Sequence, residues 1–307
     1  MRNFNIDFTK CFKKVLIVYV AVFLIGAIMA FVFGVDLDIN FKGGAKISYT
    51  YSGEISEQKI ETSAKKVLDK KFDVSKSTGL AGDTKSFEIT LAGKNSLSTA
   101  KQDKLTETLK ADFKKNEINL SSANSVSPTI AGTFFAKSFV AVLITAALVI
   151  VYVGFRFKKI GGVSAAITAL CALVFDILVT FFACVIFRLQ IDSNYIAVIL
   201  TILGYSLNDT IVIYDRIREN ERLDPEKEIG ALVNESVNKV MVRNIVTTIT
   251  TITAVVIIIV VAEVFALTTL RTFAIPMAFG LISGAASSLF IAPQLWVIWK
   301  KRKALKK

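Results

Sequence analysis

The sequence of 307 residues contains no histidine and only three cysteines. Without histidine, a histidine-ligated metal site is excluded, and any proton transfer must use carboxylates, hydroxyls and water. Cys11, Cys171 and Cys184 are too scattered for a CxxC site or a disulfide framework. The phosphate-binding pattern GxxxxGK[ST] is also missing, so we expect no direct ATP hydrolysis. We therefore expect neither a metal, nor a cofactor, nor catalytic residues, and the chain is not expected to be an enzyme.

Hydrophobic residues, in contrast, make up 53% of the chain and are grouped into long runs. An apolar run of about 18 residues or more indicates a transmembrane helix, because roughly 20 residues cross a hydrocarbon core of about 30 Å. The first run follows several basic residues but is too long for the apolar region of a signal peptide, so we expect a retained span. The predicted spans are 15–34, 133–155, 161–187, 192–214, 244–264 and 271–299.

The formal net charge of +12 comes from basic residues that collect in alternate loops. Such loops face the cytoplasm under the positive-inside rule, which predicts that both chain ends are cytoplasmic. Because no basic patch carries interleaved aromatic residues, we expect membrane lipid rather than nucleic acid around this chain. The basic clusters are Arg156, Lys158 and Lys159; Arg216, Arg218, Arg222 and Lys227; and the tail from Lys300 to Lys307.

The predicted domains are a first segment at 1–34, an extracytoplasmic domain at 35–131, five further spans at 132–299 and a cytoplasmic tail at 300–307. Within 35–131, alternating apolar residues indicate half-buried strands, and helical spacing indicates two helices. The strands are marked by Ile47, Tyr49 and Tyr51 and by Phe87, Ile89 and Leu91; the helices by Ile60, Ala64, Val67 and Leu68 and by Leu105, Leu109 and Phe113.

This order of elements favours a small α+β domain of the split βαβ, or ferredoxin-like, kind. The third and last strands of that fold are only weakly marked in the sequence. The predicted fold class is thus an α-helical membrane protein with six transmembrane helices, with the α+β domain between the first and second spans.

Three ionisable residues require an explanation at membrane depth: Asp176 near the middle of the third span, Asp209 in the fourth and Arg243 at the start of the fifth. Each costs about 2.5–3.5 kcal/mol at the bilayer centre on insertion scales, so such residues usually have a partner or a function. Lys137, Glu263 and Arg271 lie at span ends and are expected to be interfacial anchors. Helical spacing places Asn208 and Asp209 on one face, together with Tyr205 and Val212, and that face is expected to point into the bundle. We interpret Asp209 and Asn208 as parts of a proton-coupling site; the alternative is an aspartate that only bonds neighbouring helices.

Arg243 begins a second polar stripe, which continues through Thr247, Thr250 and Thr251. An interaction of Asp209 with Arg243 or with a threonine is geometrically possible, because both helices reach the same depth from the cytoplasmic side. Alternatively, Arg243 extends to the interface as a topology charge. Asp176 has no polar stripe around it on its own helix, and either a coupling role or a structural role fits it.

Small residues follow one ridge of the last span, where Gly280, Gly284 and Ser288 are four residues apart. Such residues allow close approach of helix backbones, and we assign them, with Gly204, to helix packing. A face that slides during a working cycle would have the same composition.

Several motifs closely resemble the SecD/SecF family of protein-export membrane proteins. The longest is the stretch from Leu203 to Asn220, which reads LGYSLNDTIVIYDRIREN. The family's Ser-Val-x-Pro stretch and its Gly-x-x-x-Gly-x-x-Ser-Ser segment are also present, in the family order. The shorter matches are Ser125, Val126 and Pro128; Ser236, Arg243, Thr247, Thr248, Thr250 and Thr251; and Gly280, Gly284, Ser287 and Ser288.

The chain departs from the family pattern at three places. The acid of Asp-Phe-x-Gly-Gly is Asn40 here, the histidine of a His-Asp pair is Phe175, and a Thr-Tyr pair is replaced by Ala285 and Ala286. Roles that depend on those lost groups do not carry over, whereas the positions of Asp209 and Arg243 are intact.

The resemblance implies a member of the resistance-nodulation-division superfamily that pairs with SecD. It further implies association with the SecYEG translocon and through it with SecA. It also implies use of the proton gradient, with H⁺ or alternatively Na⁺ as the coupling ion, to help move a preprotein across the bacterial cytoplasmic membrane. Asp209 and Arg243 match positions of that family's proton path. Two alternatives stay open: a half-size proton-driven exporter of lipids or small molecules, and a scaffold whose carboxylates carry no ion.

Overall fold

A computed structural model describes residues 6–68, 71–78, 85–92 and 98–305. The basic residues Arg2, Lys306 and Lys307 at the two chain ends lie outside this described part of the chain. Six helices in it are long and apolar enough to cross a membrane, as predicted. They are α1 (Phe8–Phe33), α5 (Pro128–Arg156), α6 (Gly162–Ile186), α7 (Ser193–Leu223), α8 (Ile229–Val264) and a last helix made of α9 (Thr268–Ala286), the π-helix η3 (Ser287–Ile291) and α10 (Ala292–Ala304).

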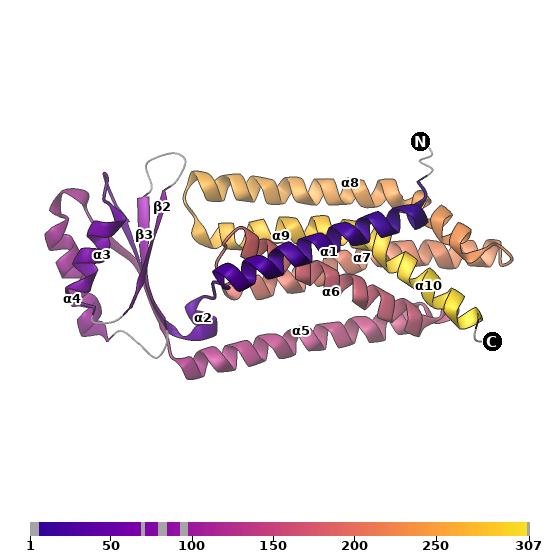
Figure 1. Ribbon diagram of the computed structural model, residues 1–307, viewed down its shortest axis with the longest axis horizontal. Coiled ribbons are helices and arrows are strands. Elements are labelled where there is room, and N and C mark those ends of the chain that lie inside the picture. Colours follow the sequence, from indigo (N-terminus) through magenta and orange to yellow (C-terminus); the bar gives the residue numbers. More distant parts are fainter. Residues whose placement is uncertain (1–5, 69–70, 79–84, 93–97, 306–307) are drawn as a thin grey trace.

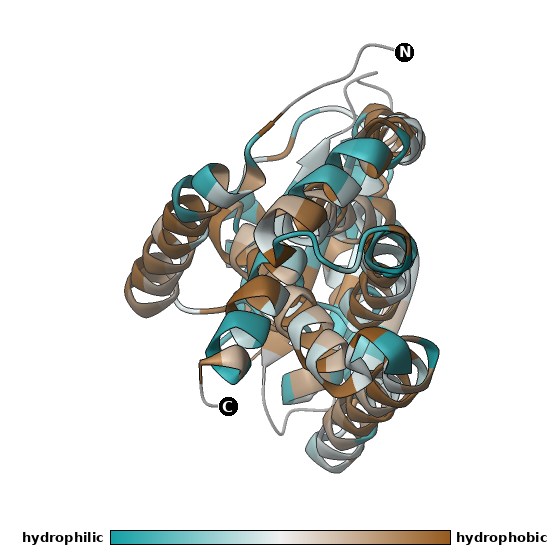
Figure 2. Cartoon of the chain, turned by 90° about the vertical axis from the view of Figure 1, so that its right-hand side faces the viewer, coloured by the Kyte–Doolittle hydropathy of each residue, from teal (hydrophilic) through white to brown (hydrophobic). Residues whose placement is uncertain are grey.

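The helices run alongside one another, and a small sheet lies beyond one end of the bundle (Figure 1). Helix α1 begins and α10 ends at the opposite end, as an even number of spans requires. Helices α7 and α8 extend beyond the apolar runs at that end, because charged residues continue the helical pattern outside the hydrophobic stretch. Seen from this end, hydrophilic residues gather on the near ends of the helices, and hydrophobic residues cover their length (Figure 2).

The interior of the bundle is formed mainly by α6, α7 and the last helix, whereas α1, α5 and α8 expose apolar side chains on their outer faces. Phe31 on α1 and Phe155 on α5 are among the most exposed, at 92% and 77%. Exposed apolar side chains at this density are typical of a lipid-facing surface. The α6 helix is therefore a central element, and its polar residues have to find partners inside the protein.

The sheet has four antiparallel strands in the order β2-β3-β1-β4, and α3 and α4 pack on one face. The predicted alternation is confirmed: Tyr49 and Phe87 face each other across β1 and β3, both fully buried. Leu105 and Leu109 of α4 and Ile60 of α3 complete this core. The elements are α2 (Ile39–Lys42), β1 (Gly44–Tyr51), α3 (Glu57–Lys65), β2 (Asp73–Thr78), β3 (Lys85–Ala92), α4 (Thr99–Asp112), the 3-10 turn η1 (Lys114–Asn116), β4 (Asn119–Val126) and, in the bundle, the turn η2 (Lys158–Ile160).

The sheet is attached to the bundle at both of its ends. Gly43 and Gly44, both at positive φ, turn the chain from α2 into β1, and Gly44 lies so close to the Leu91 carbonyl that a side chain would not fit. At the other end, β4 passes directly into α5, whose first turn is capped by Ser127. Two short connections thus couple the sheet to α1 and α5.

Candidate functional site

Asp176 lies in the middle of α6 and is completely buried. Three serine hydroxyls donate hydrogen bonds to its carboxylate: Ser206 at 2.7 Å and Ser287 at 2.9 Å to Oδ2, and Ser283 at 2.6 Å to Oδ1. Charge-assisted bonds of this length are among the stronger hydrogen bonds in proteins. Because the donors come from α7, α9 and η3, this single carboxylate joins three neighbouring elements to α6.

Tyr19 adds α1 to the same cluster. Its hydroxyl lies 3.0 Å from the Ser283 carbonyl oxygen, to which it donates, and 3.1 Å from the Ser283 hydroxyl. Its ring packs edge-on against Phe175, with 5.2 Å between the ring centres. The sequence shows no polar stripe around Asp176 on its own helix, and the donors indeed lie on other helices, which the spacing within α6 cannot reveal.

Asp209 differs from Asp176 although it is almost as buried, at 3% exposure. Its Oδ2 atom is enclosed and has no hydrogen-bond partner among the described residues. An unsatisfied buried carboxylate oxygen is costly if the group is charged. Asp209 is therefore a group whose protonation would relieve a local electrostatic penalty.

Across from Asp209, α8 contributes two further unsatisfied groups. The Tyr205 hydroxyl donates to the Thr251 hydroxyl at 3.2 Å, which fixes the register between α7 and α8. Because the two helices run in opposite directions, four residues along α7 from Tyr205 to Asp209 correspond to four residues back along α8 from Thr251 to Thr247, so Asp209 lies at the level of Thr247 and its buried neighbour Thr248. The Thr248 hydroxyl and the Asn244 amide nitrogen are both buried and unpaired within the described chain.

The polar residues that the sequence placed beside Asp209 are oriented differently. Asn208 is exposed, so the prediction that it points into the bundle is wrong for this chain: adjacent helical positions differ by about 100°, and burial of Asp209 turns Asn208 outward. Arg243 and Thr247 are exposed as well, and Thr247 donates to carbonyls of its own helix. Among the described residues, Asp209 and Arg243 form no ion pair within 4.0 Å. On α8, the residues buried in the interior are Asn244 and Thr248 rather than Thr247.

The small residues of the last helix lie against α7. A β-carbon on Gly280 would fall 2.0 Å from Cδ1 of Ile202, and one on Gly284 would fall 3.0 Å from Ser206. Ser288 is buried and bonds the carbonyl of Ala285. Gly204 is different, because it is exposed and no described atom lies within 4 Å of its β-carbon position. Its assignment to packing within this chain is wrong; it belongs to an open face of α7.

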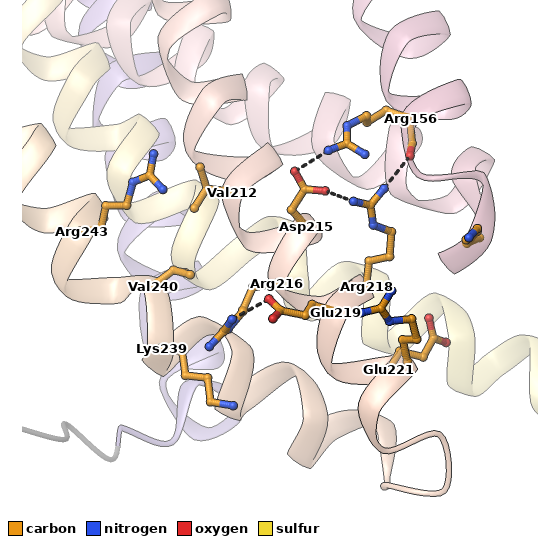
Figure 3. Close-up of a pocket in the computed structure, with 12 residues that line it drawn as sticks. Arg156, Val212, Asp215, Arg216, Arg218, Glu219, Glu221, Lys239, Val240 and Arg243 are labelled. Carbon is orange, nitrogen blue, oxygen red and sulfur yellow. Dashed lines mark hydrogen bonds and ion pairs between the residues drawn. The ribbon is translucent and has the colours of Figure 1, made fainter.

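A polar cleft of about 990 Å³ lies below Asp209, between the ends of α5, α7 and α8 (Figure 3). It extends from the charged surface to Val212 and Arg243, about one helical turn from Asp209. The Asp215 carboxylate forms ion pairs with both Arg156 and Arg218, each at 2.9 Å. Water in this cleft would reach the neighbourhood of Asp209 from one side of the membrane without exposing its carboxylate.

Sequence reasoning missed five participants: Tyr19, Ser206, Ser283, Ser287 and Asn244. Two of them carried a detectable signal, since Ser283 and Ser287 are four residues apart and share a face with the small-residue ridge. A buried aspartate requires donors, and a search for hydroxyls at matching depth in other spans would have pointed to them. Nothing in the sequence indicates that Asn244 is turned inward.

The chain matches the family "Protein export membrane protein SecD/SecF, C-terminal" over residues 105–302. Among curated proteins, it is 32% identical to the protein translocase subunit SecF of Alicyclobacillus acidocaldarius over 285 residues, which cover 92% of this chain and 89% of the relative. It is 30% identical to SecF of Petrotoga mobilis, with 97% of each chain covered. It also matches the protein translocase subunit SecDF of Bacillus subtilis at 35% identity, covering 98% of this chain but 39% of that protein.

Solved structures give the same result. A crystal structure of SecDF in a super-membrane-facing form has a TM-score of 0.69 and 25% identity, and it covers all of this chain and 40% of the other. A crystal structure of SecDF, a translocon-associated membrane protein from Thermus thermophilus, has a TM-score of 0.81 and 24% identity, with 97% and 39% covered. The present chain thus corresponds to about two fifths of the SecDF chains and to nearly the whole length of separate SecF chains.

Proposed function

Because the chain belongs to the SecD/SecF family of protein-export membrane proteins, we propose that it is the SecF-type half of a SecD/SecF pair, which uses the proton motive force to assist protein translocation through SecYEG. It is a multi-pass protein of the bacterial membrane and an accessory subunit of the Sec pathway. In this proposal it carries no enzymatic activity; it converts ion movement into motion. The single observation that carries the proposal is the buried, unsatisfied carboxylate of Asp209.

The partner in this proposal is SecD, docked on the open face of α7 and α8. Gly204 and Asn208 on α7 and Arg243 and Thr247 on α8 are exposed at or near membrane depth. An amide group facing hydrocarbon is unfavourable, so this face requires a protein partner. Support comes from the SecDF relatives, in which the part that matches this chain makes up about two fifths of one longer chain. SecD helices on this face would also enclose the space between Asp209 and Arg243.

The proton is the coupling ion in this proposal. Protonation removes the charge of Asp209 and with it the attraction to Arg243, while the neutral carboxyl donates a hydrogen bond to a neighbouring oxygen such as that of Thr248. One elementary charge moved through the membrane potential yields about 2.3 kcal/mol per 100 mV, enough to shift a two-state equilibrium about 50-fold. The cleft below Val212 provides the cytoplasmic exit.

The moving part is the sheet domain, which we place outside the membrane, with both chain ends in the cytoplasm. Its strand order β2-β3-β1-β4, with two helices on one face, is that of a ferredoxin-like domain. Asp176 and its serines would keep α1 and α6 fixed to α7 and α9, so that a shift of α7 reaches the sheet through α1 and α2. The preprotein would contact this domain, and SecA would act through SecYEG.

The test is Asp209→Asn in inverted membrane vesicles that contain SecYEG, SecA and SecD. The variant retains the shape of the side chain but cannot change its charge, so we expect loss of the stimulation of preprotein translocation by a proton gradient. The matched control is Asp224→Asn, an exposed carboxylate in the turn after α7, which we expect to retain full stimulation. Repeating the translocation measurement with a gradient of Na⁺ alone shows whether H⁺ or Na⁺ is the coupling ion. Full stimulation in Asp209→Asn would contradict the proposal.

A further inference from the structure

The cytoplasmic cleft is strongly basic. Seven basic and three acidic residues line it, which gives a net charge of +4. The residues are Arg156, Lys159, Arg216, Arg218, Arg222, Lys239 and Arg243, with Asp215, Glu219 and Glu221. Figure 3 shows Asp215 between Arg156 and Arg218 on one side of α7, and Arg216 with Glu219 on the side toward Lys239. Clustered guanidinium groups of this kind are the usual recognition element for phosphate.

The acids of the cleft neutralise only some of its cations. Asp215 is shared by Arg156 and Arg218, and Glu219 pairs with Arg216. Within the described chain, the side chains of Lys159, Arg222 and Arg243 form no hydrogen bond or ion pair, and the Nε atom of Arg216 is buried without an acceptor. The unpaired donors come from the α5–α6 connection, α7 and α8, so an anion between these elements would satisfy donors on all sides.

The position of the cleft identifies the kind of anion. Arg156 ends α5 directly after its apolar run, and Tyr152 and Phe155 in the preceding turn are half or more exposed. Exposed aromatic residues next to basic ones are typical of the membrane–water interface. Above Tyr152, Leu148 continues the exposed apolar face of α5, whereas Val151 and Phe155 line a separate cavity with residues of α6 and α10. A ligand with an anionic head in the cleft and acyl chains along α5 fits both surfaces, whereas a free phosphate would use only one.

We propose that this cleft binds the phosphodiester headgroup of an anionic membrane phospholipid. Lys159 and Arg222 donate to the phosphate, and the acyl chains lie against α5. This site goes beyond the proposed coupling function and does not depend on it, because lipid binding requires neither a proton gradient nor SecD. A bound headgroup also adds a negative charge near Arg243 and thereby links the lipid composition of the membrane to the electrostatics of the coupling site.

The test measures binding of phosphatidylglycerol by the full-length chain in zwitterionic detergent, with phosphatidylcholine as the reference lipid. The double variant Lys159→Gln/Arg222→Gln removes two unpaired donors. Each basic residue at a membrane surface contributes about fivefold in affinity, so we expect the double variant to bind about 30-fold more weakly. The matched control is Arg302→Gln/Lys303→Gln, which removes the same charge from the exposed end of α10. We expect the control to bind phosphatidylglycerol as tightly as the unmodified chain.

Four results would overturn the proposal. The unmodified chain could bind both lipids equally. Both double variants could lose affinity to the same extent, which would indicate only general charge attraction. Inorganic phosphate could bind as tightly as phosphatidylglycerol through the same two residues, which would make a free anion the ligand. Finally, the complex with SecD could fail to bind the lipid, and the Lys159→Gln/Arg222→Gln variant could fail to copurify with SecD. Together these two results would show that an acidic protein segment, rather than a lipid, occupies the cleft.

Discussion

The two buried aspartates of the helical bundle differ in the hydrogen-bond partners that surround them. Asp176 accepts three serine hydroxyls at 2.6–2.9 Å, and all its neighbours are satisfied. Asp209 has an enclosed oxygen with no partner in the described chain, and Asn244 and Thr248 on α8 each also have a buried polar atom without a partner there. A satisfied carboxylate fixes helices in place, whereas an unsatisfied one favours a change of charge state or position.

Helix α7 separates these two regions. On one side, Ser206 reaches Asp176 and Gly284 packs against Ser206. On the other side, Gly204 and Asn208 are exposed. The helix is thus fixed on its closed side and free on its open side, which is the arrangement needed for an element that responds to a partner and to protonation. The following predictions test this contrast, from the largest expected effect to the smallest.

The largest effect is expected for Asp176→Ala. The substitution leaves three buried serine donors without their acceptor, at about 1 kcal/mol each, so the free energy of unfolding should fall by about 3 kcal/mol. Asp209→Ala breaks no hydrogen bond of the described chain and should cost less than about 1 kcal/mol by the same reasoning. Denaturant unfolding of the purified chain in detergent measures both. Equal losses would remove the contrast between the two aspartates.

A second prediction compares two glycines on the two sides of α7. Gly280→Ala places a methyl group 2.0 Å from Ile202 and 2.7 Å from the Thr180 hydroxyl, and we expect a loss of about 1–3 kcal/mol. Gly204→Ala meets open space and improves helix propensity, so the isolated chain should be unchanged or more stable by up to about 1 kcal/mol.

The same pair of glycine variants distinguishes folding from partner binding. We expect Gly204→Ala to weaken copurification with SecD, because it adds volume to the open face. Gly280→Ala should mainly lower the temperature of thermal unfolding. A stable Gly204→Ala chain that retains SecD fully would show that this face does not carry the partner.

The smallest effect concerns a contact at the end of the bundle opposite the sheet. Glu228 caps α8 and bonds Lys301 of α10, and the ammonium of Lys301 lowers the pKa of this glutamate from about 4.5 to about 2. A lowered pKa stabilises the folded state above pH 4.5, and this contribution is lost as the pH falls from 4.5 toward 2. Because both side chains are exposed, the effect should be about 0.3 kcal/mol. Thermal unfolding of Glu228→Gln across this range should lack the step seen in the unmodified chain.

Much of the fold could be predicted because its signals are local. Long apolar runs identify the spans, and strict alternation identifies β1 and β3, whose one face is buried by α3 and α4. The strands β2 and β4 were weakly marked because they form the two edges of the sheet. Most of their residues are exposed, so neither face imposes an apolar pattern.

The site could be predicted only in part, because its contacts join different helices. Sequence alone identifies Asp176, Asp209 and Arg243 as ionisable residues at membrane depth. It cannot show that Ser283 and Ser206 converge on Asp176, nor that Asn244 replaces Thr247 inside the bundle. Rotation of a helix about its axis is set by the packing of its neighbours, and an error of one position exchanges a buried residue for an exposed one.

The most direct test of the account is an infrared measurement of the Asp209 carboxyl group in membranes that contain the chain with SecD. The account predicts a protonated carboxyl band that appears and disappears reversibly with pH, persists in Asp176→Asn and is missing in Asp209→Asn. A carboxylate at position 209 that stays ionised over the whole range and ignores an imposed proton gradient would contradict it.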